Sequence, residues 1–371
     1  MAGMAYAAGA VAPVVSIAKS PAFTISDKAM VHTVLGSDTK NGPAGVAFDV
    51  LKAFEGWTMD SHAHEQSDEL LYFLGRGLLT VGKSMVHVHH GDAILIKAGS
   101  AHSFVGESNL LAFQFYQSAG PEQRFLAMKK AKDKYEEPAP LQPLPQDPRL
   151  LSRYDFSATT ADGGQVEAAL ALYAKDAGAK KKYENYAAGF ENVLKGFFQQ
   201  RKTAELMGPA ETFRFELKKK VEAMGTGFPC AGVDVESFSV TAAAEIANPG
   251  FVRVNVKMAK SYPVAHGFLQ PLLDTKSGNL RLWYGKSGDD VSELFAGREE
   301  VVAIVRSGSL ELSAGGKKVK ATAGDVIHAL ADSVQNPMAT GKAPVRLLVF
   351  SRPAQAFVPP PSGAVVGIPE L

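Results

Sequence analysis

Two stretches of the chain alternate apolar and polar residues with a period of two. The first runs from about residue 44 to 117, in short runs of Val, Ile, Leu and Phe that end at Gly, Asp or Ser. The second begins near residue 233 and has the same texture. Such alternation at regular spacing is typical of half-buried strands. We therefore expect β-barrels over residues 44–120 and 233–355.

The two stretches also match each other as an internal repeat. The segment ELLYFLGRGLLTVG, which begins at Glu69, corresponds to EEVVAIVRSGSLELSAGG, which begins at Glu299. HHGDAILIKAGSAH in the first stretch corresponds to TAGDVIHALADSVQ in the second. Two copies of one barrel explain this economically. The predicted fold is therefore predominantly all-β, with two jelly-roll barrels.

The region between the barrels, residues 121–232, has a different composition. Five prolines lie between residues 138 and 148, which predicts a linker or surface strap. Residues 165–224 then place apolar groups at steps of three and four, which predicts helices. We expect residues 1–43 to form an amino-terminal arm and residues 356–371 a carboxyl-terminal tail.

The amino end leaves two alternatives open. Residues 3–18 are small and apolar, as in the core of a secretion signal, yet no Lys or Arg precedes Lys19. The other alternative is an ordered arm packed on one of the domains. Cys230 is the single cysteine and cannot form an internal disulfide. We favour a cytoplasmic protein and leave a cleaved signal as the alternative.

Charge and hydropathy exclude two classes of partner. The 39 Lys and Arg residues balance 38 Asp and Glu residues, so overall charge offers no footprint for a phosphate backbone. No uninterrupted apolar run reaches the length of a membrane span. We expect a small-molecule substrate and neither nucleic acid nor a membrane as a partner. A homodimer is the oligomeric state to be tested.

Four residues of the first barrel have the spacing of a metal site. His62 and His64 are separated by one residue, so on a strand both imidazoles point to the same face. Glu69 follows on the next strand, and His102 follows a turn at Gly99. Three imidazoles and one carboxylate suit Fe(II), Mn(II), Ni(II), Cu(II) or Zn(II), with positions left open for other ligands.

These blocks resemble the two motifs of the cupin superfamily, in which three His and one Glu are metal ligands. The resemblance is strong over residues 44–117 and weak over 245–352, and all four ligand positions match. Arg76, Lys97 and Gly106 depart from the usual Gly, Pro and Asn. None of these positions supplies a ligand. The resemblance implies one divalent metal per chain, with Fe(II) favoured.

The remaining histidines do not form a second site. Gln335 stands at the position of His102, and the region before Glu299 and Glu300 lacks an HxH pair: Ser292 with Leu294, or Glu293 with Phe295, would occupy it. We expect His266 and His328 to be structural. We expect the run His87, His89 and His90 to be solvated on an edge strand, because no carboxylate follows at a suitable distance.

One intact site beside one degenerate barrel is similar to the quercetin dioxygenases among the bicupins, whereas oxalate decarboxylases normally retain both sites. The resemblance implies an oxygen-using enzyme in which Glu69 is both ligand and base. Phe73 and Phe104, if they flank the metal, would favour an aromatic or otherwise apolar substrate. Oxygen-independent isomerase, lyase or hydrolase chemistry and non-catalytic binding or storage are the alternatives.

Overall fold

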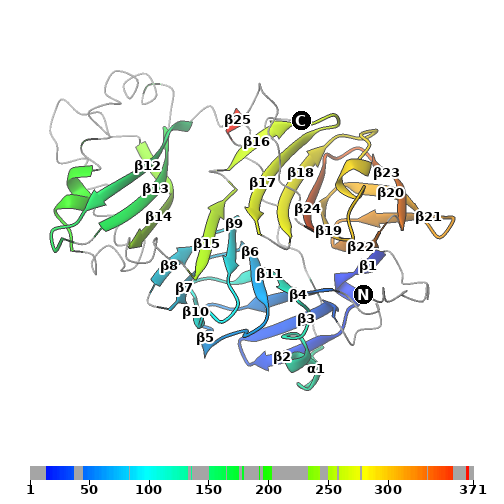
Figure 1. The fold of residues 1–371 in the computed structure, drawn as a ribbon, viewed down its shortest axis with the longest axis horizontal. Coiled ribbons are helices and arrows are strands. Elements are labelled where there is room, and N and C mark those ends of the chain that lie inside the picture. The colour runs from blue at the N-terminus through cyan, green and yellow to red at the C-terminus, as the bar shows by residue number, and fades with distance from the viewer. Residues whose placement is uncertain are drawn as a thin grey trace, which may run out of the picture.

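The computed structural model describes most of both predicted barrels and parts of the connecting region. The described residues are 14–36, 45–82, 84–132, 135, 150–163, 165–174, 178, 192, 195–202, 233–242, 250–256, 259–275, 278–331, 333–353 and 365–366. No helix in these ranges is long and apolar enough to cross a membrane. The architecture is two β-sandwich halves and a separate three-stranded sheet (Figure 1).

The amino-terminal half consists of a seven-stranded and a four-stranded sheet. The larger has the order β15-β9-β6-β11-β4-β3-β2, and the smaller β5-β10-β7-β8. All the pairs are antiparallel. The strands are β2 (Ala22–Ser26), β3 (Ala29–Leu35), β4 (Val46–Ala53), β5 (Thr58–His62), β6 (Asp68–Leu74), β7 (Gly77–Val81), β8 (Ser84–Val88), β9 (Asp92–Ile96), β10 (His102–Gly106), β11 (Leu110–Gln117) and β15 (Phe251–Asn255), and the short helix α1 (Gln123–Leu126) follows β11.

The carboxyl-terminal half repeats this arrangement with an eight-stranded and a three-stranded sheet. The orders are β1-β22-β19-β24-β18-β17-β16-β25 and β21-β20-β23. The elements are β1 (Val14–Ser16), η1 (Ile17–Lys19), β16 (Lys260–Pro263), β17 (Phe268–Asp274), β18 (Asn279–Gly285), η2 (Ser292–Leu294), β19 (Glu300–Ser307), β20 (Ser309–Ala314), β21 (Lys317–Thr322), β22 (Asp325–Leu330), β23 (Val334–Thr340), β24 (Val345–Arg352) and β25 (Val365–Val366). The predicted all-β fold with two barrels is confirmed.

The two halves exchange edge strands. The amino-terminal strand β1 pairs with β22 of the carboxyl-terminal half, and β15, from the carboxyl-terminal part of the chain, pairs with β9 of the amino-terminal half (Figure 1). β2 and β3 extend the first sheet beside β4. The seven-stranded sheet of the amino-terminal half therefore begins before the predicted boundary at residue 44. β15 falls within residues 233–355, which were assigned to the second barrel, but it belongs to the amino-terminal half.

The connecting region differs most from expectation. β12 (Leu150–Thr159), β13 (Gln165–Ala174) and β14 (Val233–Ala242) form an antiparallel sheet of their own. The predicted helix is thus wrong over residues 165–174, because the run VEAALALYA fits a period of two as well as one of 3.6, and pairing with two neighbouring strands decides between them. Residues 178, 192 and 195–199 are helical, and the rest of residues 175–232 lies outside the described residues.

The large sheets of the two halves pack face to face. Alternate residues of β4, β6 and β11 enter this shared core together with residues of β18, β19 and β24. The ring centroids of Phe115 and Phe350 are 5.5 Å apart across it. The other residues of β4, β6 and β11 face the interior of the amino-terminal barrel, where Leu51, Leu71 and Ala112 form part of a second core. This alternation points Glu69, Gln114 and Asp49 into the barrel.

Candidate metal centre

The three predicted histidines meet at one end of the amino-terminal barrel. His62 is the last residue of β5 and His102 the first of β10, and the two are directly opposite in the strand register. The ring centroid of His102 is 4.3 Å from that of His62 and 5.2 Å from that of His64. One nitrogen from each ring lies within 4.8 Å of the others. No other group of three or more His, Cys, Asp or Glu side chains converges in this way among the described residues.

The turn before β10 has a defined role in this convergence. Gly99 has a φ of +77°, a conformation that a residue with a Cβ rarely adopts. Its backbone N–H donates a 2.9 Å hydrogen bond to the carbonyl oxygen of His64. The loop that delivers His102 is thereby attached to the segment that carries the other two histidines.

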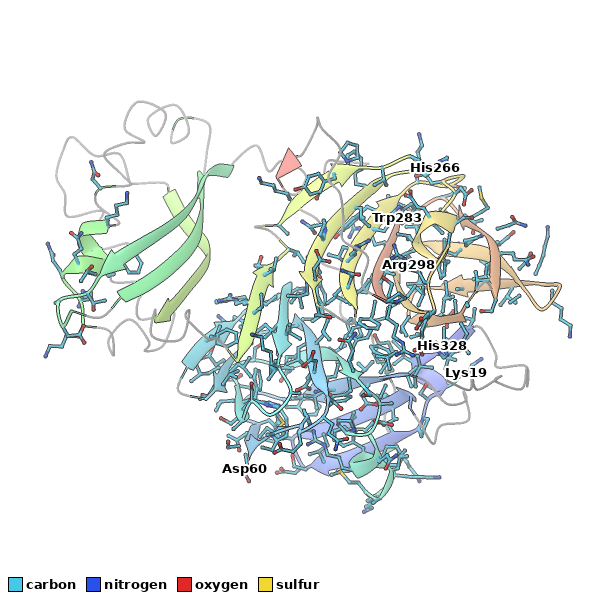
Figure 2. All side chains as sticks on the ribbon, in the orientation of Figure 1. Lys19, Asp60, His266, Trp283, Arg298 and His328 are labelled. Atoms are coloured by element: carbon cyan, nitrogen blue, oxygen red, sulfur yellow. The ribbon has the colours of Figure 1, made fainter. Side chains whose placement is uncertain are left out.

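The imidazoles are oriented by backbone carbonyls. Nδ1 of His62 lies 3.0 Å from the carbonyl oxygen of Asp60, and Nδ1 of His102 lies 2.9 Å from that of Ser100. A ring that donates from Nδ1 leaves the Nε2 lone pair available to a metal. The Nε2 atoms of all three histidines are buried, and those of His64 and His102 lie beside the carboxylate of Glu69. Figure 2 shows Asp60, in the middle of β5, at the edge of the amino-terminal half.

Glu69 completes the cluster. Its Oε2 atom lies 3.1 Å from Nε2 of His102 and 3.5 Å from Nε2 of His64. Burial disfavours the charged carboxylate, but hydrogen bonds and charge from His102 and His64 outweigh burial and hold the pKa of Glu69 below its ordinary value. Burial also opposes charge on His102, yet Glu69 raises the pKa of His102. An ionised carboxylate and three available imidazole nitrogens could hold one divalent transition metal.

Three polar residues behind Glu69 were not found in the sequence analysis. Gln114 donates a 3.1 Å hydrogen bond from Nε2 to Oε1 of Glu69, so that Oε2 faces the histidines. Tyr116 is directly opposite Glu69 in the strand register and packs edge-on against His64, with 5.2 Å between ring centroids. Asp49, opposite Gln114, is fully buried. The only signal in the sequence was a polar residue inside an apolar strand, which has no motif spacing.

The predicted substrate-contacting aromatics lie deep in the barrel. Phe73 and Phe104 are each 3% exposed and stack with their ring centroids 5.6 Å apart. They belong to the apolar core of this half, and Trp57 packs on Phe104 with a centroid distance of 6.2 Å. That they contact a substrate stays a prediction.

Strand pairing identifies the positions in the carboxyl-terminal half that correspond to Glu69 and His102, and neither holds a metal ligand. On β19, Val302 pairs with His328, and the corresponding pair in the other half is Leu70 with Leu95. The preceding residue, Val301, therefore takes the position of Glu69. The sequence repeat had suggested Glu299 or Glu300 for that position. Val81 and Ala314 each lie beside the two-residue turn that ends their hairpins, and they pair with His102 and Val334 respectively. The structure therefore puts Val334 at the position of His102, not Gln335 as the sequence repeat suggested.

The remaining histidines are placed individually. His328 is buried, and its Nε2 lies 2.8 Å from Oε1 of Glu300. His266 is exposed. The prediction of a solvated His89 is wrong, because its side chain is only 12% exposed and lies beside Asp92, whose carboxylate accepts a 2.7 Å hydrogen bond from Arg253 of β15. The His87 side chain lies outside the described residues.

Comparison with known proteins identifies the region that carries the site. Residues 54–115 match the model of the cupin domain. Oxalate decarboxylase of Bacillus subtilis, an enzyme with Mn(II) centres, matches with a TM-score of 0.50 and 12% identity, covering 93% of this chain and 78% of that chain. A single-substitution variant of the same enzyme has a TM-score of 0.50 and 11% identity, with 92% and 77% covered.

AerE of Microcystis aeruginosa matches with a TM-score of 0.46 and 9% identity, covering 91% of this chain and 98% of that chain. No curated protein matches the chain in sequence. The resemblance to oxalate decarboxylase extends over both halves and concerns the fold. The amino-terminal half therefore contains a cupin domain, and the two halves together have the bicupin fold.

Proposed function

We propose that this protein is a metal-dependent enzyme that oxidises a small organic substrate with dioxygen at the His62, His64, Glu69 and His102 site. The observation that carries the proposal is the convergence of the three histidines, two of which also place Nε2 beside the carboxylate oxygen Oε2 of Glu69. When bound there, a divalent transition metal supplies Lewis acidity and open positions for substrate and oxygen.

Each residue of the site has its own role. The imidazoles of His62 and His102 are held in position by hydrogen bonds to backbone carbonyl oxygens. Glu69 is the one group of the four able to accept a proton from an acidic substrate hydroxyl, at Oε2, while Gln114 holds Oε1. Burial raises the pKa of Tyr116 well above its ordinary value, and the charge of Glu69 raises it further, so the phenol stays protonated.

A second candidate is an oxygen-independent lyase reaction on a carboxylate. It is supported by the similarity in fold to an oxalate decarboxylase with Mn(II) centres. The same ligands and the same proton acceptor would serve it. Non-catalytic metal binding is the third candidate, and it predicts no turnover of any kind.

A paired assay separates these candidates. The protein is loaded separately with Fe(II), Mn(II), Ni(II) or Cu(II) and screened against small phenols, enediols and carboxylates, with oxygen uptake and carbon dioxide release recorded together. We expect oxygen uptake that stops under anaerobic conditions. Turnover that continues without oxygen supports the lyase instead, and absence of turnover with every metal contradicts both.

The variant Glu69→Gln tests the base. It keeps one oxygen ligand but removes the charge, so we expect metal to be retained in part and turnover to fall by about 100-fold or more, the usual scale for general-base catalysis. His266→Ala, an exposed histidine in the other half, is the matched control. Wild-type turnover in Glu69→Gln with metal bound would exclude Glu69 as the base.

A further inference from the structure

The carboxyl-terminal half contains a cavity at the position that corresponds to the metal site. It has a volume of about 300 Å³ and lies between η2 and the facing ends of β22 and β23. Val334, which stands at the position of His102, lines it, and so do the next two residues, Gln335 and Asn336. The metal ligands have been lost from this barrel, but the space they would surround is retained.

A buried arginine in this cavity has incomplete hydrogen bonding. Arg298 is 9% exposed and lines the cavity, and its Nε and Nη1 atoms are buried without a hydrogen-bond partner. Figure 2 shows Arg298 among the strands of the carboxyl-terminal half, between Trp283 and His328. A buried cation without a counter-ion is costly, because burial removes its hydration and nothing replaces it.

A second guanidinium adds to the positive charge of the same barrel interior. Arg281 lies on the inward face of β18 and is 7% exposed. Burial lowers the pKa of Arg298, and the charge of Arg281 lowers it further, which shows that the two cations act on each other. The carboxylate of Asp274 is 3.9 Å from Arg281 but is itself half exposed. The buried carboxylate of Glu300 is already bound by His328 and Arg352.

Apolar side chains form much of the remaining wall of the cavity. Phe295, Leu330 and Val334 line it beside Arg298. A guanidinium presents parallel N–H groups that match a planar carboxylate, whereas an apolar wall is a poor surface for a fully hydrated inorganic anion. Clefts of this size, mainly apolar with a few polar groups, are typical of small-molecule sites.

We propose that this cavity binds a small organic carboxylate, with its carboxylate group on Arg298 and its apolar part against Phe295, Leu330 and Val334. The bound anion supplies the counter-charge that Arg298 lacks within the described chain. The site is separate from the His62, His64, Glu69 and His102 cluster and requires no metal.

Calorimetric titration of the full chain with benzoate tests this, using benzamide as the uncharged analogue and inorganic phosphate as the anion without an apolar part. Titrations are made on metal-free and on metal-loaded protein. We expect benzoate to bind equally in both forms, benzamide not to bind, and phosphate to bind more weakly. Binding of benzoate only to the metal-loaded form would assign it to the histidine site and overturn the proposal, and so would tighter binding of phosphate.

Three variants locate the binding. Arg298→Gln should weaken benzoate binding by at least about tenfold, the scale expected when charge-assisted hydrogen bonds are lost. Gln335→Glu places a negative charge at an exposed position of the cavity, with little risk to folding, and should weaken it similarly. Lys286→Gln removes an exposed charge from the same half and should leave binding unchanged. No binding to wild type, or unchanged binding in both cavity variants, would overturn the proposal.

Discussion

Gln114 and Glu69 are joined by a buried hydrogen bond between neighbouring strands, with Nε2 donating to Oε1 over 3.1 Å. Both side chains point into the barrel, and the bond fixes which carboxylate oxygen faces the histidines. A residue that does not touch the metal position thus determines the orientation of one that does. Partners of this kind commonly change metal affinity by about 10 to 100-fold when they are removed.

Replacing Gln114 should therefore weaken metal binding. Gln114→Leu keeps the approximate volume but leaves Oε1 without its donor, so we expect the dissociation constant to rise by about 10 to 100-fold. Competition against a chromogenic chelator measures this, and the absorption spectrum of the Co(II)-loaded protein reports any change in ligand geometry. Gln335→Leu, at the corresponding end of the other half, is the control. An unchanged affinity and spectrum would show that Gln114 does not position Glu69.

The number of metal ions per chain follows from the loss of ligands in the carboxyl-terminal half. Val301 and Val334 stand where Glu69 and His102 stand in the other half. We expect elemental analysis to give about one divalent metal per chain, and His102→Ala to lose most of it. His266→Ala should retain it. Two equivalents in the wild type would contradict this assignment.

The pH dependence of metal binding is set by His102. Glu69 raises the pKa of His102 above its ordinary 6.5, whereas burial lowers that of His62. A metal needs neutral imidazole, so protons compete first at His102. We expect affinity to begin falling while the pH is still above about 6.5. Calorimetry in buffers of different ionisation enthalpy should show proton release on binding at neutral pH, and binding without it would contradict the proposed pairing.

The stability of the metal-free protein should also depend on pH, through His102 and Glu69. A raised pKa means that the contribution of His102 to stability is present below 6.5 and is lost as the pH rises through its folded value. The lowered pKa of Glu69 means that its contribution is present above 4.5 and is lost as the pH falls through its folded value. The pair therefore stabilises the metal-free fold most between pH 4.5 and 6.5. Unfolding measurements across this pH range, on protein from which a chelator has removed the metal, check this.

The sequence predicted those parts of the molecule in which residues recur at a short, regular spacing. Alternation with a period of two predicted the barrels, and one-residue spacing with a following turn predicted His62, His64 and His102 together. The pairings of β1 and β15 could not be predicted, because each joins strands far apart in sequence, Val14 with Ile327 and Phe251 with Ile96. Gln114 and Arg298 have no spacing rule, and only the fold brings each to its site.

Asp49 offers a test of how the interior behind the site is organised. It lies opposite Gln114 on β4 and is fully buried. Burial raises its pKa well above 3.8, and the nearby carboxylates of Glu122 and Glu69 raise it further, against a hydrogen bond with Thr33 and the charge of Arg124. The folded state therefore retains a proton that the unfolded state releases. The contribution of Asp49 to stability is therefore greatest below pH 3.8 and falls as the pH rises towards its folded pKa.

Asp49→Asn removes this titration while keeping the shape of the side chain. The variant should gain stability over the wild type as the pH is raised from about 4 to 7, by at least about 1.4 kcal/mol, the equivalent of one pKa unit. Urea unfolding of the metal-free proteins across this range measures the difference, with Asp27→Asn, an exposed turn residue, as the control. A variant less stable than the wild type at neutral pH would mean that Asp49 is ionised and held by partners in the folded barrel, so that the barrel interior carries two negative charges behind the histidines rather than one.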